Sequence, residues 1–491
     1  MQMNHLMDRK SFQQLAATCN IIPVGVEILA DTETPVSLLY KFLARQGALF
    51  LLESVEGGEH WGRYSFLGVS ARSHLKIYQN TVDVIHKTSS EQIEHNGDPL
   101  QVLQDYMAQF KPAQVRELPR FWGGMVGYLT YEMVSFFEAI PHDYPIEKPL
   151  AHFVLPDEII IFDNIRHTLF CIVLAFLDDQ FSVDGFYDKA KQRVQEIISE
   201  INQPLTVTQP SEFQPATGLK VSTKAADYRS MVATVKDHIH NGDVIQTVIS
   251  QPFVYEFPPD PWSLYRAQRY INPSPYLFFM NFDEMTLVGS SPETMVRLEN
   301  GVATLRPIAG TRPRGKNEKE DRRLADELLR DEKEIAEHIM LVDLGRNDLG
   351  RVAETGSVQV TDLMTVERYS HVMHMVSNIT CDLKDGCSAW DLLRAAFPAG
   401  TLTGAPKVRA MEIIAALETE PRGPYGGAVG YVSFSGNLDM AITIRTACIE
   451  NSTLTVRAGA GIVADSDPEK EYAETVNKAM AIQKALQLIG A

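Results

Sequence analysis

Residues 276–306, YLFFMNFDEMTLVGSSPETMVRLENGVATLR, form the stretch of this sequence that says most about its fold. Its apolar and β-branched residues fall into short runs, which predict strands at residues 276–282, 286–289, 294–298 and 302–306. The pair Asn300-Gly301 between the last two runs is typical of a tight β-hairpin. Consecutive strands joined by tight turns favour an antiparallel sheet.

Helical patterns flank this stretch on both sides. We expect a helix at residues 227–240, a long charged helix from about residue 321 to 344, a helix near residues 405–417 and a closing helix at residues 468–488. Further strands are expected within residues 427–449 and 453–458. Strands grouped between helices predict an α+β fold, in which large antiparallel sheets pack with helices in a layered sandwich.

The clearest change in composition lies at residues 202–218, NQPLTVTQPSEFQPATG, where proline, serine and threonine interrupt any periodicity. Such a segment is typical of a linker or a surface connection. We therefore divide the chain near residue 210, into an N-terminal domain of residues 1–210 and a second domain of residues 211–491. In the first half, residues 48–54 and 158–162 have the pattern of buried strands.

The chain of 491 residues has a formal charge of −18, and its basic side chains are scattered among acids. Without a basic stripe, such a surface repels phosphate backbones, so nucleic-acid binding is not expected. No apolar run approaches the roughly 20 residues that cross a bilayer. The five cysteines include no CxxC pair, which argues against a zinc site. We expect a cytoplasmic protein that binds neither nucleic acid nor a membrane.

Two of the expected helices each carry a pair of glutamates three residues apart. The pairs are Glu334 with Glu337 and Glu471 with Glu474, and residues at this spacing share one helix face. Carboxylates from two helices that face one pocket would suit Mg²⁺, which takes oxygen ligands and completes its shell with water and an anionic substrate. The same spacing is common on solvated helix faces with ordinary salt bridges, and spacing alone leaves both interpretations open.

Two glycine-rich segments look like nucleotide-binding loops but lack the required context. Residues 459–464 (GAGIVA) follow an expected strand, yet Pro468 starts the next helix too late for a dinucleotide site. Their glycine amides can still approach and hold a carboxylate. Residues 400–407 (GTLTGAPK) lack the spacing of an ATPase phosphate loop. Thr401 in that segment offers a hydroxyl either to a pocket or to a helix N-terminus.

Several short motifs follow one another in the second half of the chain. They are residues 291–293 (SPE), 307–315 (PIAGTRPRG), 333–348 (KEIAEHIMLVDLGRND), 368–374 (RYSHVMH), 400–407, 425–431 (YGGAVGY) and 457–462 (RAGAGI). This ordered set resembles the chorismate-utilising enzymes, a family that includes anthranilate, aminodeoxychorismate, isochorismate and salicylate synthases. Each motif is weak alone, but the ordered set is specific, and the resemblance covers nearly all of residues 220–491. The first half adds only residues 51–54 (LLES).

Two positions separate the branches of this family. Aminodeoxychorismate synthases typically carry a lysine nucleophile before the Gly-Thr pair, where this chain has Ala309. Isochorismate and salicylate synthases carry a water-activating lysine at the position that matches Gln246, and glutamine is no base at neutral pH. The resemblance therefore favours amination by ammonia, as in the anthranilate synthase branch. An aminodeoxychorismate synthase remains the alternative, and a non-catalytic, metal-dependent binding protein of the same fold is a second one.

The resemblance to the anthranilate synthase branch also implies roles for particular residues. Glu293 would be the acid for the leaving hydroxyl, His374 the base for the ring proton, and Thr401 would lie near them. Glu337 and Glu474 would bind Mg²⁺ directly, and Glu334 and Glu471 would support them. The residues implied in binding chorismate are Gly310, Thr311, Tyr425, Arg445, Gly459, Ala460, Gly461 and Lys478.

The same resemblance implies a partner and an effector. The sequence has no cysteine on a glycine-flanked elbow, so we expect a separate glutamine amidotransferase subunit to supply ammonia. Tryptophan is expected to inhibit through a distant pocket that joins the two halves of the chain. The residues that match this pocket are Ser54, Pro275, Tyr276 and Leu277; the alternative is that both segments are simply buried strands.

Overall fold

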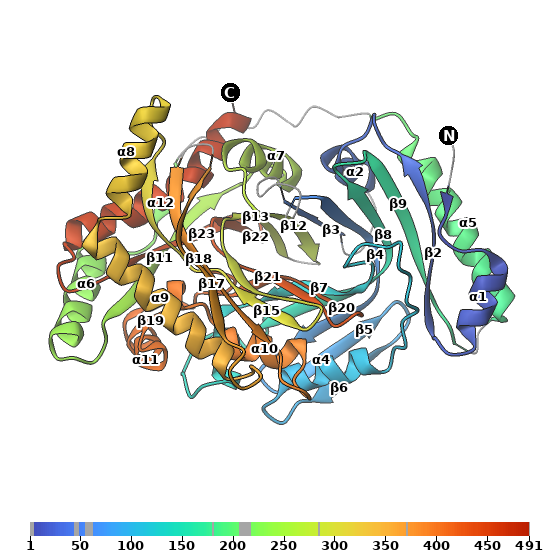
Figure 1. Ribbon diagram of the computed structural model, residues 1–491, viewed down its shortest axis with the longest axis horizontal. Helices are drawn as coiled ribbons and strands as arrows, with labels where there is room; N and C mark the ends of the chain where they lie inside the picture. Colours follow the sequence, from blue (N-terminus) through green and yellow to red (C-terminus); the bar gives the residue numbers. More distant parts are fainter. Residues whose placement is uncertain are drawn as a thin grey trace.

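The structure, a computed structural model, describes residues 4–43, 49–54, 62–178, 181–205, 218–282, 285–369 and 372–490. Its strands join into one 23-stranded hydrogen-bonded network, in which the named strand pairs are antiparallel. Helices cover this network on several sides (Figure 1). The predicted α+β class with large antiparallel sheets is therefore confirmed.

The first half of the chain supplies a strand-rich part with few helices. Its helices are α1 (Arg9–Ala16), α2 (Pro35–Phe42), α4 (Pro99–Ala108), the 3₁₀ helix η1 (Tyr131–Phe136) and α5 (Val183–Ile201). Its strands are β1 (Asn4–His5), β2 (Ile21–Leu29), β3 (Leu49–Glu53), β4 (Tyr64–Ile77), β5 (Thr81–His86), β6 (Ser90–Glu94), β7 (Gly124–Leu129), β8 (Ala151–Asp163) and β9 (Thr168–Phe176).

The second half alternates strands with longer helices. Its helices are α6 (Ala225–His240), α7 (Pro261–Ile271), α8 (Glu318–Leu328), α9 (Glu332–Gly350), α10 (Ala389–Ala396), η2 (Gly400–Leu402), α11 (Lys407–Leu417) and α12 (Pro468–Ile489). Its strands are β10 (Lys220–Val221), β11 (Gln246–Glu256), β12 (Tyr276–Phe282), β13 (Met285–Ser291), β14 (Thr294–Glu299), β15 (Val302–Leu305), β16 (Ile308–Pro313), β17 (Gln359–Arg368), β18 (Val372–Asp382), β19 (Gly404–Ala405), β20 (Ala428–Ser433), β21 (Leu438–Ile442), β22 (Thr446–Glu450) and β23 (Thr453–Ile462).

The two halves of the chain share strand pairings. Strand β3 pairs with β12, with Leu277 opposite Glu53, and β7 pairs with β20 along its whole length. Buried side chains of both halves, such as Phe66, Met295 and Tyr431, belong to one apolar cluster. The predicted boundary near residue 210 lies outside the described residues, and the division into two domains stays a prediction.

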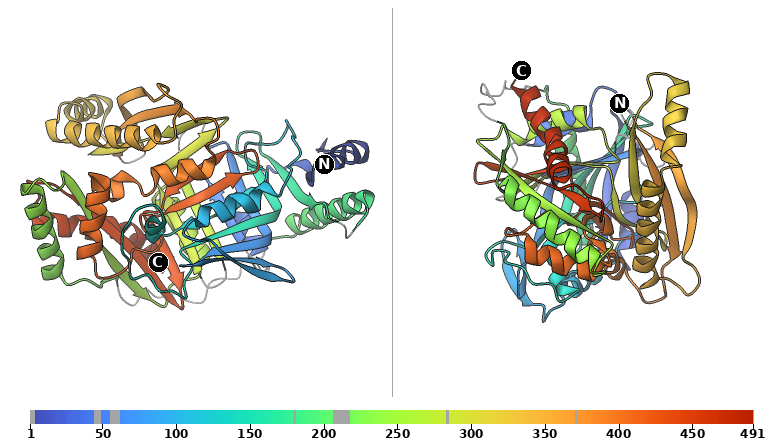
Figure 2. Two further views of the ribbon diagram at one scale, coloured as in Figure 1. Left: turned by 90° about the horizontal axis from the view of Figure 1, so that it is seen from below. Right: turned by 90° about the vertical axis from the view of Figure 1, so that its left-hand side faces the viewer.

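The arrangement of layers decides where the helices with the glutamate pairs lie. Helices α8 and α9 with strands β17 and β18 form a layer along one side of the molecule (Figure 2). Helix α12 packs against β23 and α7. At the opposite end, α1 and α5 cover the outer side of β2 and β9 (Figure 1).

The prediction of one long charged helix at residues 321–344 was wrong, because two separate helices, α8 and α9, span this region. Asn317 caps the start of α8 by accepting a hydrogen bond from the Glu320 amide. Asp331 then begins α9 by accepting hydrogen bonds from the Lys333 and Glu334 amides. An aspartate that caps a new helix interrupts the first one, although the charge pattern continues across the break. Among the described residues, no helix has the length and apolar character needed to cross a membrane.

Candidate active site

Glu293 lies in the short connection between β13 and β14, within the motif Ser291-Pro292-Glu293. Ser291 Oγ donates a hydrogen bond to the Ile442 carbonyl at 2.6 Å, and the Ile442 amide donates to the Glu293 carbonyl at 3.0 Å. Only 9% of Glu293 is exposed. Burial raises the pKa of its carboxyl to about 7, although the nearby Thr401 hydroxyl opposes this shift. Glu293 can therefore hold a proton near neutral pH and donate it.

Two cations lie near Glu293. The charges of Arg445 and Lys478 both favour the ionised form of its carboxyl. Arg445 has a φ of 49°, in the left-handed region that non-glycine residues rarely adopt. Its side chain is exposed to solvent, yet protein surrounds it closely enough to lower its pKa by desolvation. An exposed guanidinium of this kind is available to an anion.

Lys478 on α12 contacts both a candidate metal ligand, Glu474, and the glycine-rich strand β23. Its Nζ donates a hydrogen bond to the Gly459 carbonyl at 2.8 Å and lies 2.8 Å from Glu474 Oε1. Helix α12 and strand β23 are thereby joined at the point where both carry site candidates. The ammonium group of Lys478 is partly exposed, so it remains accessible to a bound anion.

His374 on β18 is held in one orientation. Its Nδ1 lies 3.2 Å from the Gly310 carbonyl and 3.1 Å from Thr311 Oγ1. Because a carbonyl oxygen can only accept, the ring proton belongs on Nδ1, and Nε2 is left as the basic atom. Burial lowers the pKa of His374, and the charge of Arg445 lowers it further. His374 is therefore neutral at pH 7, as a proton acceptor must be.

Gly310 lies at an irregularity in the pairing of β16 with β18, and its φ is 69°. A Cβ at this position would lie 3.1 Å from Glu334 Oε2 and 2.8 Å from a methyl group of Leu328. The glycine thus lets α9 approach the strand that carries Thr311. This contact places Glu334 beside the segment that holds His374.

The glycines of β23 leave room for side chains from neighbouring elements. A Cβ at Gly459 would lie 2.8 Å from the Tyr425 hydroxyl, and one at Gly461 would lie 2.4 Å from Gln246 Nε2. Burial raises the pKa of Tyr425 to about 12, so its hydroxyl stays protonated and can donate. Ala460 differs from the glycines on either side, because its methyl group lies on the other face and packs into a buried apolar cluster.

The four glutamates lie on two helices whose charges act on each other. Burial raises the pKa of Glu337, and the carboxylates of Glu334 and Glu474 raise it further. Burial and the charge of Glu474 likewise raise the pKa of Glu471. Gln246 Nε2 donates to Glu337 Oε1 at 3.4 Å, while Arg312 binds Glu334 at 3.1 Å. Crowded carboxylates of this kind are stabilised by a cation.

The donor set suits Mg²⁺, which prefers carboxylate oxygens. Within the described ranges, no three His, Cys, Asp or Glu side chains already converge as a closed metal-binding group. An ion held by Glu337 and Glu474 would take further ligands from water and from an anionic substrate, as Mg²⁺ commonly does.

Sequence reasoning missed a buried ionic group next to these candidates. The side chains of Glu418, Arg422 and Arg457 are only 4%, 2% and 6% exposed. Glu418 binds Arg422 at 2.7 Å and Arg457 at 3.1 Å. A glutamate four residues before an arginine is common on protein surfaces, so the spacing gave no sign of burial. The available signals are that Arg457 begins the motif at residues 457–462 and that Arg422 lies three residues before Tyr425, where the motif at residues 425–431 begins.

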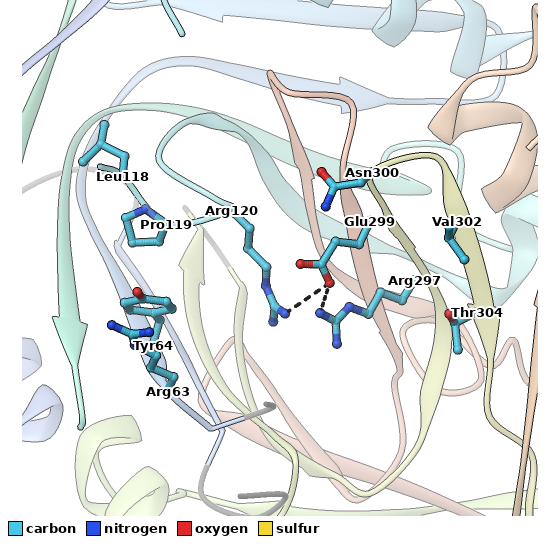
Figure 3. A pocket seen from close by; sticks show the side chains of 10 residues that line it. All are labelled: Arg63, Tyr64, Leu118, Pro119, Arg120, Arg297, Glu299, Asn300, Val302 and Thr304. Carbon is cyan, nitrogen blue, oxygen red and sulfur yellow. Dashed lines mark hydrogen bonds and ion pairs between the residues drawn. The ribbon is translucent and has the colours of Figure 1, made fainter. Parts of the chain in front are cut away.

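The four residues predicted to bind an effector line one separate pocket. They are Ser54, Pro275, Tyr276 and Leu277, and they share its wall with Arg120, Tyr431 and Asp439. The space holds about 50 Å³, which is less than an amino acid with an indole ring requires. A much larger cavity of about 800 Å³ adjoins it and shares Tyr64 and Arg120 (Figure 3). None of the catalytic or metal-binding candidates lines either space.

Known proteins resemble this chain over nearly its whole length. The family model for chorismate binding enzymes matches residues 54–484. Anthranilate synthase component 1 from Pseudomonas aeruginosa is 46% identical over 492 residues, which cover 98% of this chain and 99% of that protein. The chain belongs to the anthranilate synthase component 1 branch of the chorismate-binding enzymes. The protein of the same name from Aquifex aeolicus is 44% identical and covers 99% of both chains.

Solved structures support membership of this family. Anthranilate synthase component I from Streptococcus pneumoniae has a TM-score of 0.77 and 37% identity, and the match covers 93% of this chain and 99% of that one. The menaquinone-specific isochorismate synthase from Escherichia coli has a TM-score of 0.72 at 20% identity, covering 97% and 99%. At 20% identity, the match to the isochorismate synthase shows a shared fold and nothing about function. The predicted resemblance to chorismate-utilising enzymes, and to this branch among them, is confirmed.

Proposed function

We propose that this chain is the chorismate-binding subunit of an anthranilate synthase. It would act as a lyase that converts chorismate and ammonia to anthranilate and pyruvate, the first step of tryptophan biosynthesis. One observation carries most of the proposal. The buried carboxyl of Glu293, whose pKa is about 7, lies beside the cations Arg445 and Lys478. The choice of branch rests separately on Ala309 and Gln246, which stand where other branches carry a lysine.

Substrate binding would use the positive and amide groups around Glu293. Chorismate carries two carboxylates, and Arg445, Lys478 and the amides of residues 459–461 are donors suited to them. The protonated hydroxyl of Tyr425 adds a neutral donor. Mg²⁺ at Glu337 and Glu474, supported by Glu334 and Glu471, would neutralise substrate charge and act as a Lewis acid.

The chemistry would proceed in two steps. Ammonia forms a bond to C2 of chorismate, the ring double bonds shift, and the C4–O bond breaks as Glu293 protonates the departing hydroxyl, which leaves as water; the new ammonium group then loses a proton to solvent. Nε2 of His374 next removes the C2 proton and the bond between C3 and the enolpyruvyl oxygen breaks, so the ring becomes aromatic and the released enolpyruvate takes up a proton to give pyruvate. The raised pKa of Glu293 and the lowered pKa of His374 support this assignment of acid and base.

Ammonia would come from a separate glutamine amidotransferase subunit. The designation "component 1" of the relatives implies a second component. We propose that free ammonia at high concentration replaces this partner, and that the two subunits assemble in the cytoplasm as a heterotetramer, with a heterodimer as the alternative. Tryptophan would inhibit through the pocket lined by Ser54, Pro275, Tyr276 and Leu277, which would widen toward the adjoining cavity to admit an indole ring.

An aminodeoxychorismate synthase is the alternative function. Ala309 argues against it, because a methyl group cannot provide the amine nucleophile of that branch. Mass spectrometry of the product separates the two functions: anthranilate with released pyruvate supports the proposal, whereas a 4-amino product that retains the enolpyruvyl group would support the alternative. A non-catalytic binding protein would give neither product.

A further inference from the structure

Arg422 is the most completely bonded buried cation next to the candidate active site. Its guanidinium donates to the Leu402 carbonyl at 2.7 Å, to the Val248 carbonyl at 2.8 Å, and to both carboxylate oxygens of Glu418 at 2.7 and 2.9 Å. A buried guanidinium is costly to desolvate unless its donors are used in this way. It therefore fixes the positions of the groups that accept from it.

These acceptors belong to segments that carry site candidates. Leu402 follows Thr401, the neighbour of Glu293. Val248 on β11 pairs with Gly461 and donates its amide to the Thr403 carbonyl at 2.8 Å. The guanidinium also lies 5.8 Å from the centre of the Tyr425 ring. One side chain thus joins η2, β11 and the turn that presents Tyr425.

The first half of the chain holds the same turn from the other side. Glu132 accepts hydrogen bonds from the Arg422 amide at 2.6 Å and the Gly423 amide at 3.1 Å. The Tyr131 amide donates to the Gly423 carbonyl at 2.8 Å, and the Tyr131 ring lies 4.5 Å from the Arg422 guanidinium. Glu132 is only 3% exposed. Because an unpaired polar group is costly to bury, loss of any of these hydrogen bonds would destabilise the turn.

We propose that Arg422, together with Glu418 and Glu132, is a positioning residue for the reaction. It orients Thr401 and Tyr425 toward the substrate without touching the substrate itself. The proposal rests on the proposed function, because it assumes that Thr401 and Tyr425 face chorismate. It also gives the first half of the chain a part in shaping the active site, through η1.

A cavity of about 280 Å³ makes the proposal open to chemical rescue. Its lining includes Glu132, Glu418 and Arg422 itself. Removal of the Arg422 side chain would leave a hole that joins this cavity and is still lined by both carboxylates. A guanidinium ion from solution fits the charge and hydrogen-bonding pattern of that hole.

The test compares Arg422→Ala with and without millimolar guanidinium chloride in the ammonia-dependent assay. We expect kcat to fall at least roughly 100-fold, and guanidinium to restore a large part of it, while sodium chloride at equal ionic strength does not. Arg422→Lys, which keeps the charge but loses the fork of donors, should restore only part of the activity. Arg193→Ala is the matched control, because Arg193 binds the buried Glu158 in the first half, away from these candidates.

The outcomes separate the positioning role from a purely structural one. If Arg422→Ala melts at a lower temperature but keeps a wild-type kcat in its folded fraction, the positioning role is wrong. Should Arg422→Ala fail to fold, Glu132→Gln tests the same turn with a milder change; it should raise the KM for chorismate several-fold and lower kcat, and unchanged constants would overturn the proposal. An inactive wild-type protein would instead count against the proposed function.

Discussion

The phenolic hydroxyl of Tyr276, in the candidate effector pocket, lies 3.0 Å from Thr294 Oγ1, and Thr294 directly follows Glu293. The same hydroxyl donates to Asp439 Oδ1 at 2.9 Å, so it accepts from Thr294. The backbone of Tyr276 is also paired with Ser291. Tyr276 thus contacts residues on both sides of the candidate acid Glu293: Thr294 directly after it and Ser291 two residues before it. A ligand that moves Tyr276 would therefore also move the segment that holds Glu293.

Tyr276→Phe removes this connection while keeping the ring. We expect tryptophan inhibition to weaken roughly tenfold or more, because a hydrogen bond to a charged carboxylate is lost. Inhibition constants measured with varied tryptophan check this expectation. Tyr106→Phe is the control, since the Tyr106 hydroxyl donates to Ser73 at 2.8 Å outside the pocket. Equal inhibition of the Tyr276 variant and the wild type would refute the route from effector to acid.

Glu293→Gln tests the assignment of the acid. Glutamine keeps the shape of the side chain but cannot donate an acidic proton, so kcat should fall by about 10²–10⁴-fold. Chorismate should still bind, with a dissociation constant within a few-fold of the wild type, as measured by calorimetry in the presence of Mg²⁺. A variant that retains a tenth or more of the activity would show that another group protonates the leaving hydroxyl.

The pH dependence of the reaction follows from two shifted groups. Glu293 must be protonated and has a pKa near 7, so the rate should fall as pH rises through about 7. His374 must be neutral, and burial lowers its pKa from 6.5, so the rate should fall on the acid side only below pH 6.5. Rates must be expressed per concentration of free NH₃, which itself rises with pH. A profile without a descending alkaline limb would contradict the role of Glu293.

The metal site is tested by Glu474→Gln. Loss of one carboxylate should raise the Mg²⁺ concentration needed for half-maximal activity by roughly tenfold or more, and chelation by EDTA should abolish activity until Mg²⁺ is restored. Glu469→Gln on the same helix is the matched control, because Glu469 is exposed and binds Arg229 at 2.7 Å. If both variants need the same Mg²⁺ concentration as the wild type, Glu474 is not a ligand.

Sequence reasoning reached the parts of the site that depend on local pattern. Short motifs identified Gly459, Gly461 and Tyr425 as site candidates, but the close contacts of Gly459 with Tyr425 and of Gly461 with Gln246, which only glycine admits, are found in the structure. The break between α8 and α9 was missed, since the capping by Asp331 competes with a charge pattern that continues across it. Arg422, Glu418 and Glu132 were also missed, because their burial depends on contacts between segments 290 residues apart, as in Arg422 with Glu132.

The central claim is tested most directly by turnover of the purified chain. It would receive chorismate, Mg²⁺ and an ammonium salt at mildly alkaline pH, while anthranilate fluorescence and pyruvate are followed together. We expect magnesium-dependent anthranilate formation with an equal amount of pyruvate, suppressed by added tryptophan. Consumption of chorismate without anthranilate, or no consumption by folded protein, would contradict the account.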